Sequence, residues 1–320
     1  MTKSYFHGET LDDLMRSVVE EIQAHGDLIK PTKGAASELT GVLLELTDPR
    51  ARISRTETRG KPFSCLGEFC WYLAKTNDLS FIAYYIQAYQ QFADGDEIFC
   101  GYGPRLFDWD GINQVRNVIS LLKMNPTSRK AVIQLFDRRD IVGDHNDVAC
   151  TCTLQFMIRH NALHMFTNMR SNDVILGLPH DVFCFTMLQE VIARDLSIEL
   201  GTYKHAVGSL HIYETDVDTT RQFLDEGWQS TITSMPPMPN GDPWDGIASL
   251  LKAEIAIRTG DVFDASRFDA IDPYWADLIR LLQVYRCKKD KNPDLIKVLR
   301  EGMASDVYHP FIDKVLSQFL

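Results

Sequence analysis

The stretch DVACTCTLQF at Asp147–Phe156, together with RSNDVILGLPHD at Arg170–Asp181, decides the expected fold of this chain. Apolar and polar residues alternate along Thr153–Arg159 and again along Leu163–Met169, which is the pattern of strands with one buried face. The pair His160–Asn161 between them suits a tight turn. The two segments therefore predict a β-hairpin near the middle of the chain.

Segments on both sides of this hairpin predict a mixture of helices and strands. Asp181–Arg194 is mainly apolar and long enough for a central helix, and Pro62–Leu73 is typical of a buried helix that contains one carboxylate. The other expected elements are strands over Leu39–Leu46 and Ala131–Phe136 and helices over Leu11–Ile22 and 113–123. Because strands and helices do not alternate regularly, the fold class that we expect is α+β with a mixed sheet.

The segment Ser234–Asp245, SMPPMPNGDPWD, is dense in proline and glycine and predicts a linker. After it, apolar residues at helical spacing predict helices over 247–257, 273–285 and 293–299 and near 311–319. We expect a catalytic domain over residues 1–233 and a C-terminal helical extension over residues 246–320. The extension contains no motif that carries chemistry.

Composition excludes several classes of protein. The net charge of -11 on 320 residues repels polyanions, so we expect no nucleic-acid partner. No apolar run has the length of a signal peptide or a membrane span, so we expect no membrane association and a cytoplasmic location. The seven cysteines are too sparse for a disulfide scaffold and fit reduced thiols.

Several motifs coincide around the hairpin. Cys150 precedes a strand that contains Gln155 and Phe156, and an Arg-Ser pair and a Gly-Leu-Pro turn follow the second strand. With NPTSRK at Asn125–Lys130 and GSLHIY at Gly208–Tyr213, these motifs resemble the thymidylate synthase family in order and nearly in spacing. The resemblance covers roughly residues 35–220 and implies that family's fold.

Cys150 takes the place of the family's nucleophile, which stands between a proline and a histidine in relatives. Ala149 and Thr151 flank it here, a departure that weakens a thymidylate interpretation more than a hydroxymethylase one. C5 of a pyrimidine attacks a one-carbon donor only after a nucleophile such as a thiolate has added to C6. The alternative interpretations are a buried inert thiol, or a metal site of Cys150 with Cys152, but no further Cys or His stands nearby at zinc spacing, so we expect no metal.

The resemblance also implies a phosphate site that is shared between two subunits. Arg129, Lys130, Arg170 and Ser171 match the family's phosphate cluster, in which a neighbouring subunit lends two basic residues, so we expect a homodimer. Arg170 would also stabilise the thiolate. Lysine at position 130 is a departure from the usual arginine, and Lys33 is a weak match for the family's first phosphate arginine.

Asp181 stands where thymidylate synthases carry an asparagine that recognises uracil. Cytosine presents the opposite pattern, a donor at N4 and an acceptor at N3, and a carboxyl group that is protonated or shares a proton with N3 fits it better. The resemblance is therefore to the cytidylate 5-hydroxymethylase branch. The alternative interpretation is that Asp181 is a helix N-cap.

The other site residues are implied by the resemblance. Glu68, in Glu-Phe-Cys-Trp, would organise water and proton transfers, although it could also be a surface residue of its helix. The remaining matches are Tyr102 in the active site, His211 and Tyr213 on the ribose, and Asp173 and Trp71 on the folate.

The reaction that we expect is hydroxymethylation of CMP or dCMP at C5, with 5,10-methylenetetrahydrofolate and water. The helical extension and Lys130 favour the ribonucleotide. The alternatives are a thymidylate synthase that methylates dUMP, a hydroxymethylase of dUMP, and a catalytically inactive nucleotide-binding protein.

Overall fold

The computed structural model describes residues 2–226, 234–260 and 271–320. Its centre is a seven-stranded sheet in the order β1-β3-β7-β6-β5-β4, and β2 also pairs with the first residues of β3. The β1–β3 and β6–β7 pairs are parallel and the other pairs are antiparallel. The strands are β1 (Tyr5–Gly8), β2 (Asp27–Ile29), β3 (Ala36–Leu46), β4 (Val132–Gln134), β5 (Thr151–Arg159), β6 (Ala162–Asp173) and β7 (Glu199–Tyr213).

Helices surround this sheet, and the α+β prediction is confirmed. Long helices and short ones are both present in the described parts of the chain, and none of them is long and apolar enough to cross a membrane. The α-helices are α1 (Leu11–His25), α2 (Pro62–Leu73), α3 (Leu79–Tyr85), α4 (Tyr102–Phe107), α5 (Gln114–Met124), α6 (Gly177–Asp195), α7 (Val217–Asp225), α8 (Trp244–Thr259), α9 (Pro273–Lys289), α10 (Pro293–Glu301) and α11 (His309–Leu316).

The expected hairpin is present as β5 and β6. Its turn residues His160 and Asn161 have φ angles of 51° and 60°, the left-handed backbone of a two-residue hairpin turn. Both strands are longer than their alternating patterns suggested, because β5 begins at Thr151 and β6 continues to Asp173. The pairing therefore brings the residue before β5, Cys150, beside the far end of β6.

Two predicted boundaries were wrong. The central helix begins at Gly177, four residues before Asp181, so the N-cap interpretation of Asp181 is wrong. The expected strand over Ala131–Phe136 shortens to β4, because the N–H groups of Leu135 and Phe136 both donate to the carbonyl of Cys152 and end the regular ladder.

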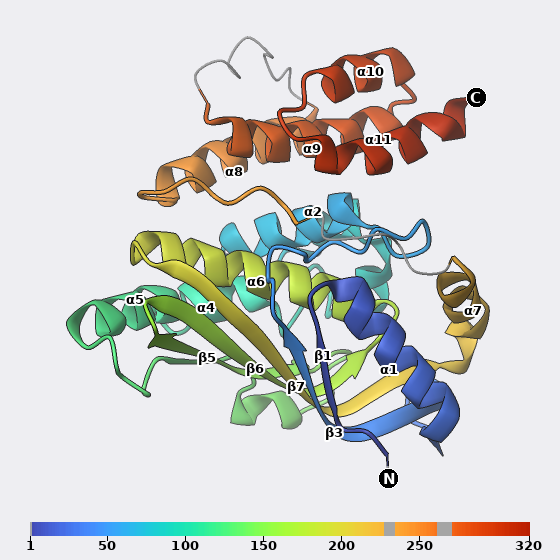
Figure 1. Cartoon of the computed structure of the whole chain (residues 1–320), viewed down its shortest axis with the longest axis vertical. Helices are drawn as coiled ribbons and strands as arrows, with labels where there is room; N and C mark the ends of the chain where they lie inside the picture. Colours follow the sequence, from blue (N-terminus) through green and yellow to red (C-terminus); the bar gives the residue numbers. More distant parts are fainter. Residues whose placement is uncertain (1, 227–233, 261–270) are drawn as a thin grey trace.

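Helices α2 and α6 lie on one face of the sheet, and the C-terminal helices lie beyond α2, farther from the sheet (Figure 1). The side chains of α2 and α6 are almost all buried, Glu68 included. Since both helices are packed from two sides, they hold the polar groups that face the sheet in fixed positions.

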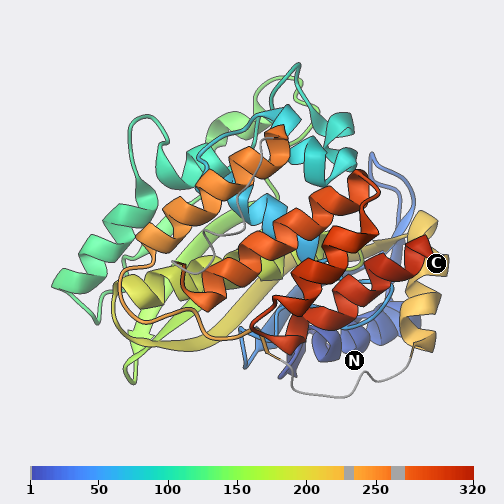
Figure 2. The ribbon, with the colours of Figure 1, turned by 90° about the horizontal axis from the view of Figure 1, so that it is seen from above.

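The predicted C-terminal helices are present as α8 to α11, which lie side by side over α2 (Figure 2). Tyr85 in α3 donates to Glu254 in α8 at 2.9 Å. The segment that we expected to be a linker is anchored, because Met235 and Met238 are buried and the Met238 N–H donates to Glu190 at 2.9 Å. The expected domain end at residue 233 lies outside the described residues, and the division into two domains stays a prediction.

Candidate active site

Cys150 and Arg170 are in contact at the end of the β5–β6 hairpin. Nη2 of Arg170 donates to Sγ of Cys150 at 3.6 Å, and the Arg170 backbone N–H donates to the Cys150 carbonyl at 2.8 Å. The guanidinium also donates to the carbonyls of Ala149, at 2.9 Å, and Val148, at 2.7 Å. The main chain before β5 therefore fixes the cation beside the sulfur.

Burial and charge act in opposite directions on the Cys150 thiol. Burial raises its pKa to about 11, Arg170 and Lys33 act to lower that pKa, and the carboxylates of Asp147 and Asp181 act to raise it. Arg170 is the group that acts most strongly against burial and in favour of the thiolate. Of the seven cysteines, Cys150 and Cys152 alone are partly exposed.

Tyr102 lies directly against the segment that contains Cys150. Its hydroxyl oxygen accepts the backbone N–H of Thr151 at 2.9 Å, and the Cys150 sulfur contributes to the raised pKa of this tyrosine after burial. The tyrosine therefore holds the first residue of β5 and lies close enough to Cys150 to interact with it electrostatically. Lys33 lies on the same side, 3.8 Å from the carboxylate of Asp147.

Asp181 projects from the first turns of α6 and is partly exposed. Its Oδ2 accepts Nδ2–H of Asn172 at 2.7 Å. Burial first, and then the nearby charge of Glu68, raise the pKa of Asp181 well above its usual value, while the bond from Asn172 opposes the shift. The surroundings thus favour a neutral carboxyl group.

Glu68 is buried, with 4% of its surface exposed, so the alternative that it is a surface residue is wrong. The hydroxyls of Tyr72 and Tyr89 both donate to its Oε1, at 3.1 and 2.6 Å. Among the described residues its Oε2 has no hydrogen-bond partner. One oxygen is therefore held in place while the other stays available to water or to a ligand. Trp71, three residues on in the same helix, packs against Tyr89 with ring centroids 5.5 Å apart.

The ends of β6 and β7 bring together the residues expected at the ribose and the folate. Asp173 pairs in register with His211, and Ser171 pairs with Ser209. The rings of His211 and Tyr213 meet edge to face at 4.7 Å. Oδ1 of Asp173 accepts two backbone N–H groups, those of Ile175 and Leu176, which fixes this carboxylate at the start of α6.

Arg129 and Lys130 stand apart from these residues. Both are exposed in the loop before β4, and in the described parts of the chain no hydrogen bond or ion pair joins them to Cys150 or Arg170. One chain therefore does not assemble the four-residue phosphate cluster, which is the arrangement expected if these two side chains serve a second subunit.

Sequence reasoning missed three polar residues behind Asp181. Asn172 bonds to Asp181 and to the buried His205, and His205 bonds to Tyr203. Alternation along β7 does place residues 203 and 205 on the buried face. A buried histidine on that face was the signal that could have found them.

The comparison with protein families agrees with this geometry. The sequence model of the thymidylate synthase family matches residues 15–236. The chain belongs to the thymidylate synthase family. This match ends before α8, so the helices α8 to α11 are outside the family's common sequence.

Curated relatives of the family match parts of the chain. A deoxyuridylate hydroxymethyltransferase of Bacillus phage SP01 is 29% identical over 228 residues, which are 66% of this chain and 59% of the relative. Thymidylate synthases of Bacillus subtilis subsp. natto and Bacillus atrophaeus are 31% identical over 121 residues, or 38% of this chain and 43% and 53% of the relatives. The chain thus spans 59% or less of the length of these relatives. The family prediction is confirmed, and the cytidylate branch stays a prediction.

The donor set of the site fits the folate cosubstrate that the family uses. Nε1–H of the buried Trp71 has no partner within the described residues, and Asp173 keeps Oδ2 free of the two backbone bonds that hold Oδ1. A donor and a carboxylate are groups that a pterin ring can meet. No group of three or more His, Cys, Asp or Glu side chains in residues 2–226, 234–260 and 271–320 has the arrangement of a metal site.

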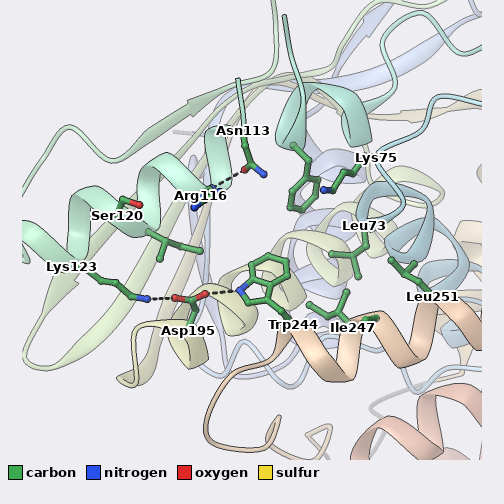
Figure 3. Close-up of a pocket in the computed structure, with 13 residues that line it drawn as sticks. Leu73, Lys75, Asn113, Arg116, Ser120, Lys123, Asp195, Trp244, Ile247 and Leu251 are labelled. Carbon is green, nitrogen blue, oxygen red and sulfur yellow. Dashed lines mark hydrogen bonds and ion pairs between the residues drawn. The ribbon is translucent and has the colours of Figure 1, made fainter. Parts of the chain in front are cut away.

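A separate cavity of about 470 Å³ lies between α5 and α8 (Figure 3). Trp244 forms part of its wall and donates to Asp195, which also accepts from Lys123 at 2.6 Å. Neither Cys150 nor Asp181 lines this cavity. The cavity is therefore separate from the candidate site around Cys150 and Asp181.

Proposed function

We propose that this protein is a one-carbon transferase that converts CMP or dCMP to the 5-hydroxymethyl nucleotide. The observation that carries the proposal is Asp181, a carboxyl group whose raised pKa favours the neutral form, in the electrostatic neighbourhood of Cys150. A neutral carboxyl group donates to N3 and accepts from the N4 amino group of cytosine, the pattern that uracil reverses.

Cys150 would start the reaction as a thiolate. Its sulfur adds to C6 of the base, the C5–C6 π electrons move onto C5, and Arg170 stabilises the sulfur anion at 3.6 Å. Tyr102, fixed by the Thr151 N–H, lies beside this sulfur and helps to hold the base against it.

Methylenetetrahydrofolate supplies the one-carbon unit when it is bound, and Trp71 and Asp173 would hold it. Glu68 would orient water through the free Oε2 and accept a proton from it. The hydroxyl of that water ends on the transferred carbon, C5 loses its hydrogen as a proton, and Cys150 leaves C6 with its electron pair. The balance is nucleotide, methylenetetrahydrofolate and water giving hydroxymethyl nucleotide and tetrahydrofolate.

Phosphate and sugar binding complete the proposal. Arg170 and Ser171 would meet the phosphate with Arg129 and Lys130 of a second copy, since one chain does not bring all four together. His211 and Tyr213 would contact the ribose. A homodimer in the cytoplasm is part of this proposal.

A second candidate is hydroxymethylation of dUMP. It is favoured by the name of the phage SP01 relative, which is 29% identical to this chain. Methylation of dUMP is favoured by the names of the Bacillus relatives. Asp181 weighs against both, because a carboxyl group that directs its proton at N3 opposes the N3–H of uracil. An inactive nucleotide-binding protein would explain the fold and would not need the Cys150–Arg170 contact.

Release of tritium from C5 separates the cytidine proposal from the two dUMP candidates and from an inactive protein. We expect CMP or dCMP labelled at C5 to lose tritium to water in the presence of methylenetetrahydrofolate, and Cys150→Ser to stop the release. Cys152→Ser is the matched control, because Cys152 is also partly exposed and should leave the rate unchanged. Faster release from dUMP would contradict the assignment of a cytidine nucleotide as the substrate. No release from any of these nucleotides would contradict the proposal that the protein is a one-carbon transferase.

A further inference from the structure

Four polar side chains form one hydrogen-bonded row from the core of the protein to the base site. The hydroxyl of Tyr203 lies 2.7 Å from Nδ1 of His205, and Nε2 of His205 lies 3.1 Å from Oδ1 of Asn172. Nδ2 of Asn172 then donates to Oδ2 of Asp181 at 2.7 Å. Tyr203 and His205 are 1% exposed and Asn172 is 5% exposed, so the row is closed to solvent at its inner end.

The buried histidine sets the direction of this row. Burial lowers the pKa of His205 to about 3, so the ring is neutral near pH 7 and carries one N–H. The amide oxygen of Asn172 faces Nε2, which places the N–H there and leaves Nδ1 to accept the Tyr203 hydroxyl. The amide could turn over only if His205 moved its N–H to Nδ1, and the Tyr203 hydroxyl, 2.7 Å from Nδ1, would then lose this nitrogen as its acceptor. The Tyr203 hydroxyl therefore keeps the NH₂ group of Asn172 directed at Asp181.

The row has a consequence for the two oxygens of Asp181. Oδ2 receives an N–H bond, and a carbonyl oxygen accepts such a bond better than the oxygen of a C–OH group. The neutral acid is therefore more stable with its proton on Oδ1. Oδ1 has no hydrogen-bond partner in the described parts of the chain, and Asp181 is partly exposed, so this proton is available to a ligand.

We propose that Asn172, held by His205 and Tyr203, is a positioning residue that makes the protein select cytosine over uracil by fixing the proton of Asp181 on Oδ1. This inference rests on the proposed function and extends it to residues behind the base site. Oδ1–H donates to N3 of cytosine, and Oδ2 uses its second lone pair to accept the N4 amino group. Uracil requires the opposite placement, with the proton on Oδ2.

The surroundings of Asp181 keep the carboxyl group neutral while the row orients it. Besides Asn172, the groups that act on Asp181 are the carboxylates of Glu68 and Asp173, and both disfavour a negative charge on Asp181. Cys150 and Tyr102 lie close enough to interact with Asp181 and are themselves neutral when their pKa values are raised. Within the described residues, no cation acts on Asp181 strongly enough to compete with these groups.

Two variants test the row at different depths. Asn172→Asp replaces the N–H donor with an acceptor, which draws the Asp181 proton onto Oδ2. Tyr203→Phe removes one hydroxyl, frees the tautomer of His205 and changes no charge, so it serves even if the first variant does not fold. The matched controls are Asn77→Asp, whose amide donates to Glu97 at 3.1 Å on the surface, and Tyr285→Phe, whose hydroxyl donates to the main chain of α3.

The measurement is calorimetric binding of CMP, UMP and 3-deaza-CMP, which lacks the N3 acceptor. We expect the wild type to prefer CMP over both, Asn172→Asp to reduce the CMP-to-UMP affinity ratio by about tenfold, and Tyr203→Phe to reduce it by about threefold. Asn172→Asp should also bind CMP and 3-deaza-CMP equally well, while both controls keep the wild-type ratios.

The outcomes separate this inference from the function on which it rests. If the wild type prefers CMP and both variants keep that preference, the row does not set selectivity and the inference is overturned. If the wild type binds UMP as tightly as CMP, the assignment of a cytidine nucleotide fails first. A loss of affinity that is equal for all three nucleotides in a folded variant would mean that the row only supports the fold, and would also overturn the inference.

Discussion

Nη2 of Arg170 lies 3.6 Å from Sγ of Cys150, and the same guanidinium donates to the carbonyls of Val148 and Ala149. The cation is therefore held by the main chain that carries Cys150, and it does not depend on a bound phosphate for its position. Arg170 therefore acts to lower the pKa of the Cys150 thiol before a nucleotide binds, and burial outweighs it.

Removal of this cation should make the thiol less acidic. Burial already raises the pKa of Cys150 to about 11, and Arg170 acts against that shift. In Arg170→Gln the pKa should rise further, so alkylation by iodoacetamide at about pH 8 should slow and its pH profile should move to higher pH. Arg139→Gln, a change at an exposed arginine paired with Asp137, is the control. An unchanged profile in Arg170→Gln would remove Arg170 from the activation of Cys150.

Replacement of the nucleophile should separate turnover from binding. Cys150→Ala should abolish conversion of nucleotide, a loss of about 1000-fold or more, because the C6 adduct cannot form. Nucleotide affinity should stay within a few fold, since Arg170, Ser171 and Asp181 are unchanged. Single-turnover rates and equilibrium binding measure the two quantities, and a variant that still turns over would show that another group attacks C6.

Asp181 should cost the folded protein stability as the pH rises. Its pKa is raised in the folded state, so the folded chain holds the proton more tightly than the unfolded chain does. The stability that this provides is complete below about pH 4 and is lost as the pH rises through the raised pKa. Each tenfold difference in proton affinity between the two states corresponds to about 1.4 kcal/mol of unfolding free energy. Asn at this position does not titrate.

The Tm margin of Asp181→Asn over the wild type should therefore grow as the pH rises above about pH 4. Differential scanning calorimetry at several pH values measures it. The same variant should shift nucleotide preference from cytidine towards uridine. A margin that is constant with pH would contradict the raised pKa.

A shared phosphate site predicts complementation between inactive subunits. Arg129→Ala removes the lent arginine, and Cys150→Ala removes the nucleophile, so each variant alone should be nearly inactive. In a mixed dimer, the Arg129→Ala subunit keeps Cys150 and receives Arg129 from its partner, which restores one site. Mixing the two after reversible dissociation should recover up to about a quarter of wild-type activity. No recovery, or full activity in monomers, would show that the site lies within one chain.

Local sequence patterns predicted most of the fold. The alternating strands and the His160–Asn161 turn were readable because a half-buried hairpin imposes a period of two and a left-handed turn. The start of α6 was not, because the Gly-Leu-Pro motif looked like a turn before the helix. Pro179 lies in the first turn of α6, where a missing N–H costs no helical hydrogen bond.

The candidate-site residues that lie in motifs similar to those of the family could be predicted from the sequence. The contact between Cys150 and Arg170 followed from the resemblance, and the structure brings the two together. Alternation along β7 could have marked His205 as buried, but the hydrogen bonds of the row were not predictable, since they require the parallel pairing of β6 with β7 and residues that are far apart in sequence. The likeness to the family also said nothing of α8 to α11.

Mass spectrometry of CMP, dCMP and dUMP after incubation with the protein and methylenetetrahydrofolate tests the central claim most directly. Addition of CH₂O raises the mass by about 30 Da, whereas methylation raises it by about 14 Da, since water and hydride lead to different products from one C6 adduct. We predict a gain of about 30 Da on CMP or dCMP and none on dUMP. A gain of about 14 Da on dUMP with unchanged cytidine nucleotides would contradict the proposal.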